Sequence, residues 1–336
     1  MRVLVTGATG LVGLETMERL RREPDVEVVG VSRRRSATNG SIVAWDMARE
    51  PAPDELRGPW DAIVHAAADT RWTMTPEEAQ QANVTTVGEL VPLASAETHV
   101  VHVSTAYATG LGGSVESEDL ADYRNTYEWS KAHAERLARD SFERLTIVRP
   151  PLIIGRREDG RAARFTGMYT VLRGIAASMV PVIVGDADAY FDVIPVDDLA
   201  ELLTASAGEP GSGAVLTLAA GEGAPRVEEA VEAMTLALNR WREDAGCEPF
   251  DMPRLISEDS WSRFFLPFAR SELSPRQLRI LDLLSNFQPY MQVTSPLEPT
   301  HRVADATACI APAVGYWAES ERRMASMPPR PWKASA

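Results

Sequence analysis

The sequence is poor in cysteine, and its apolar stretches are short. Only two cysteines, Cys247 and Cys309, occur among 336 residues, too few for a disulfide framework or a structural zinc site. No uninterrupted apolar run approaches the length that crosses a bilayer, and the N-terminal residues lack the apolar core of a secretory signal. We therefore expect a cytoplasmic protein that does not enter a membrane.

Basic charge is scarce as well. The chain has 48 acidic and 34 basic side chains, a formal net charge of -14 at pH 7. This excess repels nucleic acid and anionic membrane surfaces wherever no local patch reverses its sign, so neither is expected as a partner. The five histidines show no metal-ligand spacing with other ligands, and we expect them to be structural and the protein to hold no metal.

Strand-like runs alternate with helical patterns through the first half of the chain. The runs cover residues 2–6, 26–32, 62–67, 99–105 and 145–150. This alternation is typical of a parallel sheet wrapped by crossover helices. It predicts an α/β fold with a doubly wound sheet of the Rossmann type.

Two helix starts carry clear capping signals. In TPEE, Thr75 is the expected cap, with Pro76 at the first helical position and Glu78 three residues after the cap. The stretch NTYE repeats this pattern from Asn125 to Glu128. Both patterns predict helices that begin directly after these caps.

The alternation weakens after Gly155, which suggests a division of the chain. We expect residues 1–155 to form the dinucleotide-binding domain, with 186–220 returning to it. A smaller, mainly helical substrate-binding region is expected at 156–185 and 221–326, followed by a proline-rich tail at 327–336. The apolar segment 260–287 is suited to line a substrate pocket, to cover the domain or to form a homodimer surface, and the sequence leaves these three open.

A glycine-rich loop opens the chain. In VTGATGLVG, Gly7, Gly10 and Gly13 follow a strand and precede a helix. Glycines there permit a tight turn and let backbone N–H groups at a helix N-terminus approach a diphosphate. The loop therefore predicts dinucleotide binding, with a purely structural turn as the alternative. The remaining expected contacts of this segment are Thr9, Leu11 and Val12.

The residues after the second strand-like run indicate which dinucleotide binds. About 20 residues beyond the loop, where an acidic residue would hold the ribose of NAD, the chain has Ser32, Arg33 and Arg34. An arginine can make paired hydrogen bonds to a 2′-phosphate, which favours NADP; the alternative is a solvated basic strand end. Asp46, followed by Met47, is placed to accept the adenine amino group, although a turn aspartate would look the same.

A tyrosine and a lysine stand four residues apart in YEWSK. On a helix that begins near Asn125, Tyr127 and Lys131 share one face, so the ammonium is expected beside the phenol. A phenol has a reference pKa of about 10, and a neighbouring cation together with an oxidised nicotinamide would favour phenolate. The pair predicts a general acid for a carbonyl oxygen, whereas a solvated helix face is the alternative.

Hydroxyl groups follow the fourth of these strands. In HVSTAYATG, Ser104 or Thr105 would project from the carboxyl end of the sheet, where open α/β sheets bind ligands. A hydroxyl there can donate to a developing oxyanion while Tyr127 protonates it. Either hydroxyl alone would also fit a strand-end cap, but the occurrence of all three motifs in order argues against coincidence.

Together these motifs resemble those of an extended short-chain dehydrogenase/reductase. The matching segments span about residues 1–205 and are TGATGLVG, HAAADTRW, NVTTVGEL, HVSTAYATG, YEWSK, VRPPLIIG and FDVIPVDDLA. HAAADTRW and STAY resemble, more narrowly, the fatty acyl-CoA reductase and carrier-protein thioester reductase (male sterility-type) branch. The resemblance implies an NADPH-dependent reductase in biosynthesis that acts on an acyl thioester, an aldehyde or a ketone.

The resemblance also implies roles for individual residues. Thr105, Tyr127 and Lys131 would form the catalytic triad, and Lys131 would also bond the nicotinamide ribose. Ser104 is the second choice for the hydroxyl and, like Trp72, a candidate substrate contact. The further cofactor contacts that it implies are Ala66, Ala67, Ala68, Asn83, Pro150 and Pro151.

The chain departs from the larger family members, in which adenylation and carrier domains precede the reductase. No such domain is recognisable in these 336 residues, so the resemblance implies an acyl donor that arrives in trans, as a small molecule or on an acyl carrier protein. Two other functions fit the fold. A sugar-nucleotide epimerase or dehydratase would usually retain NAD and have an acid near Ser32; a non-catalytic NADP-binding sensor would not need the Thr-Tyr-Lys set.

Overall fold

A parallel sheet forms the centre of the first of two compact units in this computed structural model. The structure describes residues 1–33, 42–177, 182–209, 213–267, 278 and 284–329. The first unit comprises Met1–Pro151, Val196–Leu218 and Pro299–His301. The second comprises Leu152–Pro195, Ala219–Glu298 and Arg302–Ala336, so the stretch 186–195 belongs to the second unit.

The sheet has the strand order β12-β10-β6-β5-β4-β1-β2-β3. Its strands are β1 (Arg2–Thr6), β2 (Glu27–Ser32), β3 (Ile42–Ala44), β4 (Ala62–His65), β5 (His99–Val103), β6 (Leu145–Arg149), β10 (Ala214–Ala219) and β12 (His301–Arg302). β1 to β6 and β10 pair in parallel. The doubly wound Rossmann fold expected from the sequence is therefore confirmed. The order reverses at β1, which lies between β2 and β4.

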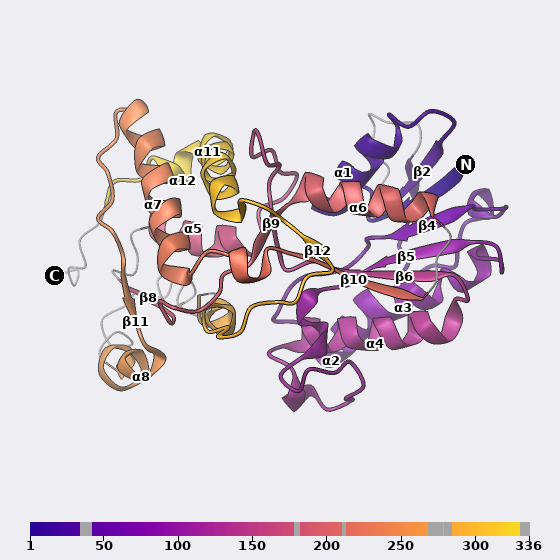
Figure 1. Ribbon diagram of the computed structural model, residues 1–336, viewed down its shortest axis with the longest axis horizontal. Coiled ribbons are helices and arrows are strands. Elements are labelled where there is room, and N and C mark those ends of the chain that lie inside the picture. The colour runs from indigo at the N-terminus through magenta and orange to yellow at the C-terminus, as the bar shows by residue number, and fades with distance from the viewer. Residues whose placement is uncertain (34–41, 178–181, 210–212, 268–277, 279–283, 330–336) are drawn as a thin grey trace. The chain divides into compact units, whose positions relative to one another are not determined.

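Helices cover both faces of this sheet (Figure 1). One face carries α1 (Leu11–Leu20) and α6 (Val196–Gly208), and the other carries α2 (Pro76–Ala79), α3 (Thr85–Gly88) and α4 (Thr126–Ser141). A π-helical turn, η2 (Gln80–Val84), joins α2 to α3. The 3-10 turns of this unit are η1 (Asp54–Leu56), η3 (Val91–Leu93), η4 (Ala106–Thr109) and η5 (Leu120–Asp122).

Both predicted helix caps are present. Thr75 accepts from the Glu78 N–H, and Glu78 accepts from the Thr75 N–H, which completes the capping box. Asn125 Oδ1 accepts from the Glu128 N–H at 3.0 Å. Glu128 also reaches one residue further back and accepts from the Arg124 N–H at 3.2 Å. Local sequence therefore fixes where α2 and α4 begin.

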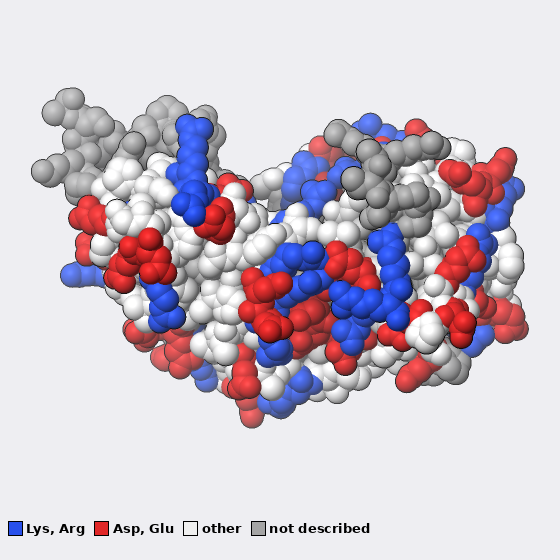
Figure 2. Space-filling model, turned by 90° about the horizontal axis from the view of Figure 1, so that it is seen from above, with Lys and Arg blue, Asp and Glu red and all other residues white. Residues whose placement is uncertain are grey.

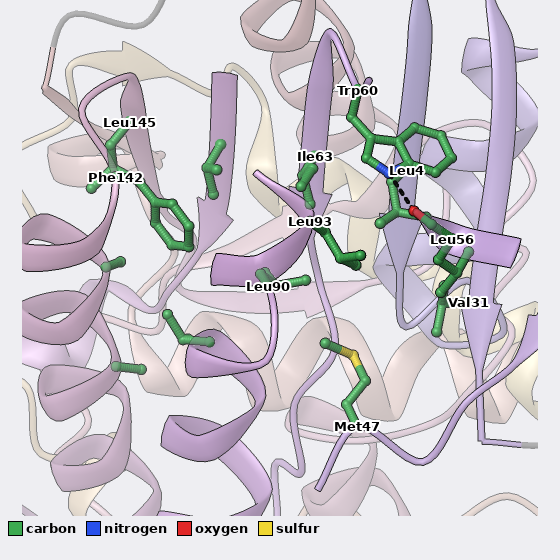
Figure 3. Close-up of a cluster of buried hydrophobic side chains, with 14 of the residues drawn as sticks. Leu4, Val31, Met47, Leu56, Trp60, Ile63, Leu90, Leu93, Phe142 and Leu145 are labelled. Atoms are coloured by element: carbon green, nitrogen blue, oxygen red, sulfur yellow. Dashed lines mark hydrogen bonds between the residues drawn. The ribbon is translucent and has the colours of Figure 1, made fainter. Parts of the chain in front are cut away.

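The main core of the first unit lies between the sheet and the α3–α4 side. Figure 3 shows its side chains converging, with the Trp60 indole N–H donating to the Leu56 carbonyl at 2.9 Å. Leu4, Ile63 and Val100, on three neighbouring strands, point into it together with Ala134 and Ala138 of α4. Met47 also lies in this cluster and is 5% exposed. Burial of this face holds α4, and the residues on it, against the sheet.

The second unit is mixed, with short strands and more helix. Its strands are β7 (Leu152–Ile154), β8 (Val182–Val184), β9 (Val193–Pro195) and β11 (Arg254–Ile256), and they pair as β7–β9 and β8–β11. Its helices and turns are α5 (Met168–Ala176), η6 (Gly221–Gly223), α7 (Val227–Asp244), α8 (Glu258–Ser260), η7 (Trp261–Phe265), η8 (Gln288–Met291), η9 (Ala306–Cys309), α11 (Ile310–Ser320) and α12 (Arg322–Ala325). Much of the apolar segment 260–287 lies outside the described residues.

The surface of the protein is charged, and its helices are short or polar. On the face drawn in Figure 2, acidic side chains stand among the basic ones. Within the described part of the chain, every helix is too short or too polar to span a bilayer.

Candidate active site

The candidate residues of the first unit gather at one edge of its sheet. The loop after β1, the ends of β2 and β3, and the segments after β4, β5 and β6 all lie at the carboxyl ends of parallel strands. Because parallel strands end at the same edge, the chain order brings these six segments together (Figure 1). The edge is centred on β1, where the strand order reverses and where doubly wound folds bind dinucleotides.

The glycine loop fits a diphosphate. Gly7 has φ +68°, and a Cβ there would lie 2.7 Å from the Ala66 carbonyl oxygen. A Cβ at Gly13 would collide with the Gly7 carbonyl oxygen. Gly10 caps α1 without a side-chain hydrogen bond, so the first-turn N–H groups of Leu11, Val12 and Gly13 remain directed at the loop. Thr9 is exposed in the turn. This geometry suits an anion at the helix N-terminus.

The ends of β2 and β3 hold the predicted specificity residues. Ser32 is buried as the last residue of β2, and Arg33 is exposed directly after it; Arg34 lies outside the described residues. Asp46 is half-buried after β3, and its carboxylate lies 4.0 Å from Arg49. The Met47 side chain packs in the core (Figure 3), so only its backbone is left to meet a cofactor.

A carboxylate that the sequence analysis did not single out lies beside Arg33. Although burial opposes it, the pKa of Asp69 is lowered, because Arg71 hydrogen bonds to this carboxylate and Arg33 adds its positive charge. The Arg71 Nε lies 3.0 Å from both Asp69 carboxylate oxygens. The edge therefore carries two arginines and one paired aspartate.

The segment after β4 is held by Asn83. Asn83 is fully buried; its Oδ1 accepts from the Asp69 N–H at 2.7 Å, and its Nδ2 donates to the Asp69 carbonyl at 3.0 Å and to the Ser130 hydroxyl at 2.8 Å. Asn83 sits in the π-turn η2, a local widening that often marks functional sites. It thereby ties Ala66, Ala67 and Ala68 to α4. Trp72 is half-buried three residues beyond Asp69.

The two candidate hydroxyls point to different partners. The Thr105 hydroxyl is 3.4 Å from the Pro150 carbonyl oxygen and accepts from the Tyr107 N–H at 3.4 Å, both long hydrogen bonds. The Ser104 hydroxyl instead donates to the buried Glu135 carboxylate at 2.5 Å. The Ala106 N–H also donates to the Pro150 carbonyl, at 2.8 Å, which joins the ends of β5 and β6. Pro150 is buried, and so is Pro151 after it. Of the two hydroxyls, Thr105 is the less firmly engaged.

Lys131, on the buried face of α4, is almost fully buried. Its Nζ donates to the Val103 carbonyl at 2.8 Å, at the end of β5, and lies 3.4 Å from His102 Nε2. Burial lowers the pKa of Lys131 to about 8, although the charge of Glu135 opposes this. Lys131 is therefore largely charged at pH 7. Its ammonium lies at Val103, two residues before Thr105.

The expected lowering of the Tyr127 pKa does not occur in this structure. Tyr127 is half-buried in the first turn of α4. Burial raises its pKa, because a phenolate is poorly solvated there, and the negative charge of Glu128 raises it further. The Lys131 ammonium is turned to Val103 and His102. The phenol therefore stays protonated at neutral pH, as a proton donor requires.

A buried ion-pair network beside the candidate catalytic residues was missed by the sequence analysis. Glu135 is fully buried and accepts from Arg149 at 2.8 and 2.6 Å and from Arg139 at 3.1 Å, besides Ser104. It stands one helical turn after Lys131. Glu135 thus links α4 to the ends of β5 and β6. Its i+4 spacing from Lys131 was the available signal, but the spacing does not reveal which arginines lie opposite.

Comparisons with known proteins agree with the fold. Residues 49–203 match the male sterility protein family. Fatty acyl-CoA reductase 1 of Gallus gallus is 26% identical over 281 residues, which covers 62% of this chain and 55% of that protein. The chain thus spans about half the length of the curated relatives it matches.

Two solved structures illustrate the likeness of fold. The terminal R domain from the myxalamid PKS-NRPS biosynthetic pathway has a TM-score of 0.72 and 21% identity, covering 97% of this chain and 92% of that one. A UDP-glucuronic acid 4-epimerase from Bacillus cereus in complex with NAD has a TM-score of 0.61 and 15% identity, covering 95% and 99%. At these identities the structures share the fold alone.

The glycine loop and the sheet order are those of a Rossmann fold of the kind that binds NAD(P). The chain resembles the extended short-chain dehydrogenase/reductases and, among them, the fatty acyl-CoA reductase and carrier-protein thioester reductase branch, as its motifs predicted.

Proposed function

We propose that the protein is an NADPH-dependent reductase that reduces the carbonyl group of an acyl thioester, delivered in trans, to an aldehyde or an alcohol. One observation carries this proposal: the Lys131 ammonium lies at the last carbonyl of β5, 2.8 Å from the Val103 oxygen. Lys131 stands one helical turn after Tyr127, and Val103 stands two residues before Thr105. A proton donor, a hydroxyl and a cation thus border the edge that holds the glycine loop.

Each side chain has a role that follows from its surroundings. When bound, the reduced nicotinamide would supply the hydride that the carbonyl carbon receives. The C–S bond of the thioester then breaks, and the thiol leaves with the hydrogen of the new hydroxyl group, so that an aldehyde remains; a second NADPH would be needed to reduce the aldehyde to the alcohol. The Tyr127 phenol, protonated because burial raises its pKa, donates its proton to the carbonyl oxygen as charge develops there. The Thr105 hydroxyl donates to the same oxygen, and its long contact with Pro150 is readily exchanged for this one. Lys131 holds the ribose and offers its charge to Tyr127.

Arg33 supports NADP as the cofactor. It is exposed at the end of β2, while the neighbouring carboxylate, Asp69, is engaged by Arg71. A guanidinium in this position can pair with a 2′-phosphate, which NAD lacks. The epimerase with a similar fold was solved with NAD, so cofactor preference separates the two functions.

The curated relatives support an acyl thioester as the substrate. Fatty acyl-CoA reductase 1 of Gallus gallus is named for an acyl thioester substrate. The matched segment contains the Tyr127–Lys131 pair and the Ser104–Thr105 strand end. The same side chains would serve an aldehyde or a ketone, so substrate class is decided by experiment.

The test is the loss of absorbance of the reduced nicotinamide, with NADPH and NADH in parallel, against acyl-CoA thioesters, acyl carrier protein thioesters, aldehydes and ketones. Tyr127→Phe removes the proton donor. Tyr123→Phe is the matched control, because its hydroxyl donates to the Ser117 carbonyl in the preceding loop, at 2.9 Å. We expect NADPH consumption with thioesters that is lost in the first variant and kept in the second.

Two outcomes contradict the proposal. Turnover with aldehydes or ketones alone would keep the roles of Thr105, Tyr127 and Lys131 and discard the thioester. No turnover of any carbonyl compound, together with an NAD that stays bound during purification, would favour the epimerase.

A further inference from the structure

Three polar side chains form a row next to an apolar row on the same face of the sheet. Thr6, His65 and His102 are register partners on β1, β4 and β5. All three are at most 1% exposed. Side chains two residues apart on a strand share a face, and the positions two residues earlier belong to the apolar core: Leu4, Ile63 and Val100. The row therefore stands where the core pattern predicts apolar residues.

Contacts join this row from the glycine loop to the catalytic lysine. The Thr6 hydroxyl lies 2.8 Å from His65 Nδ1 and accepts from the Ala67 N–H at 3.2 Å. The His65 and His102 rings stack with centroids 5.4 Å apart and planes at 21°. His102 Nε2 then lies 3.4 Å from Lys131 Nζ. Thr6 is the residue directly before Gly7, so the row runs from the glycine loop to Lys131.

The protonation states fix the direction of the last contact. Burial, and then the charge of Lys131, lowers the pKa of both histidines, so both rings are neutral at pH 7. A protonated lysine only donates, which makes His102 Nε2 the acceptor and places the ring proton on Nδ1. The ammonium thus has two acceptors, this nitrogen and the Val103 carbonyl.

The row leaves two nitrogens without partners. His65 Nε2 and His102 Nδ1 are buried and make no hydrogen bond to any residue that the structure describes. An unpaired buried polar atom is destabilising, because it has lost its hydrogen bonds to water. An apolar side chain at either position would avoid that cost and continue the core. At position 102, however, the other ring nitrogen faces Lys131. This contact gives a reason for a histidine there.

We propose that His102 is a positioning residue that acts through Lys131: its neutral imidazole accepts a hydrogen bond from the ammonium and holds the charged lysine at the end of β5, ready for the dinucleotide. This inference rests on the proposed function only in taking Lys131 as the group that meets the ribose. His65 supports the ring of His102 by stacking and is itself tied to Thr6.

The other groups around Lys131 set the sign of the effect. Glu135 faces it from its own helix, and the two histidines face it from β5 and β4. Of these, Glu135 and His102 favour the charged form of the lysine, while burial disfavours it. Removing the acceptor at His102 therefore lowers the Lys131 pKa below about 8.

The sequence makes this pKa directly measurable, because it contains only two lysines, Lys131 and Lys333. Lys333→Arg leaves one lysine, so a protein labelled with ¹³C at lysine Cε gives a single ¹³Cε signal whose titration reports Lys131. His102→Phe keeps an aromatic ring on His65 and removes the acceptor. His102→Gln keeps an acceptor. His99→Phe is the matched control, since His99 is buried on the same strand but on the opposite face, 3.0 Å from Thr146.

The expected results differ among the variants. We expect the Lys131 pKa to fall by about one unit in His102→Phe, to return most of the way in His102→Gln and to stay unchanged in His99→Phe. With a fall from about 8 by one unit, the charged fraction at pH 8 drops about fivefold. Affinity for NADPH at pH 8, measured by nicotinamide fluorescence, is expected to fall by the same factor, and less at pH 6.

The outcomes separate this inference from the proposed function. A Lys131 pKa that is equal in His102→Phe and His99→Phe overturns the positioning role, whatever the activity. A shifted pKa in a protein that reduces no carbonyl refutes the reductase and leaves the role of His102 standing. If His102→Phe does not fold, His102→Asn serves instead: its shorter side chain remains polar but falls short of Nζ, and an unchanged Lys131 pKa there would equally overturn the inference.

Discussion

Replacing Glu135 by glutamine tests whether the network behind the triad holds the first unit together. The substitution preserves the volume and one acceptor but removes the charge that faces Arg149 and Arg139. Two guanidinium groups would then remain around a neutral amide whose side chain is fully buried. We expect a loss of stability well above that of a surface ion pair.

The size of this loss follows from burial. Breaking a buried ion pair by removing one partner costs about 3–5 kcal/mol. The side chains of Arg149 and Arg139 are 15% and 35% exposed, so water partly compensates them and the lower figure, about 3 kcal/mol, applies. At roughly 2–4 °C per kcal/mol for a unit of this size, the Tm should fall by roughly 6–12 °C.

Thermal unfolding followed by circular dichroism measures this change. The matched control is Glu97→Gln, which breaks the ion pair to Arg144 at 3.2 Å, where the Glu97 side chain is 90% exposed. Exposed pairs contribute at most about 1 kcal/mol, so the control should lower the Tm by no more than a few degrees. Equal changes in the two variants would refute the assignment of Glu135 as the centre of the network.

Three further predictions concern the site. Thr105→Val should lower kcat by about 10²–10³-fold, whereas Ser104→Ala, whose hydroxyl is engaged by a carboxylate, should keep kcat within about tenfold; steady-state kinetics on the same substrate compare them, and the reverse order would exchange their roles. Arg33→Ala should raise the KM for NADPH about 10- to 100-fold and leave that for NADH unchanged; equal effects on both would contradict a phosphate contact. Because the pKa of His65 is lowered from 6.5 to about 3 in the folded state, the unfolded chain binds the proton more tightly, and the free energy of unfolding should fall as pH drops from 6.5 towards 3, by about 1.4 kcal/mol per pH unit. His65→Gln should reduce the total slope by about that amount in urea titrations and leave the part due to His102, whose pKa is lowered too; an unchanged slope would exclude His65 as a source.

Much of the site was predictable because it depends on local sequence. The glycine loop is recognisable from the positions of Gly7, Gly10 and Gly13. A glycine suits position 7 because φ is positive there and a Cβ would collide with Ala66. The start of α4 follows from Asn125, which sets the face that Tyr127 and Lys131 share. Periodicity and capping act over a few residues, so they can be recognised without knowledge of the fold.

The state of Tyr127 was not predictable in this way. The spacing of Tyr127 and Lys131 suggested a phenol whose pKa is lowered by the lysine. In the structure, burial and Glu128 raise that pKa, and the ammonium contacts Val103 and His102 instead. The direction in which a lysine side chain points depends on the acceptors that the sheet offers it, and helix spacing does not contain that information.

The sequence by itself determined the order of strands and helices, the helix starts and the glycine turn, because each depends on dihedral preferences and periodicity within a short stretch. Only the tertiary structure decided which partners meet across the sheet. His102 and Lys131 are 29 residues apart, and Glu135 and Arg149 are 14 apart. Their contacts arise from the register of β4, β5 and β6 and from the packing of α4, which are set by burial of the whole core rather than by any local signal.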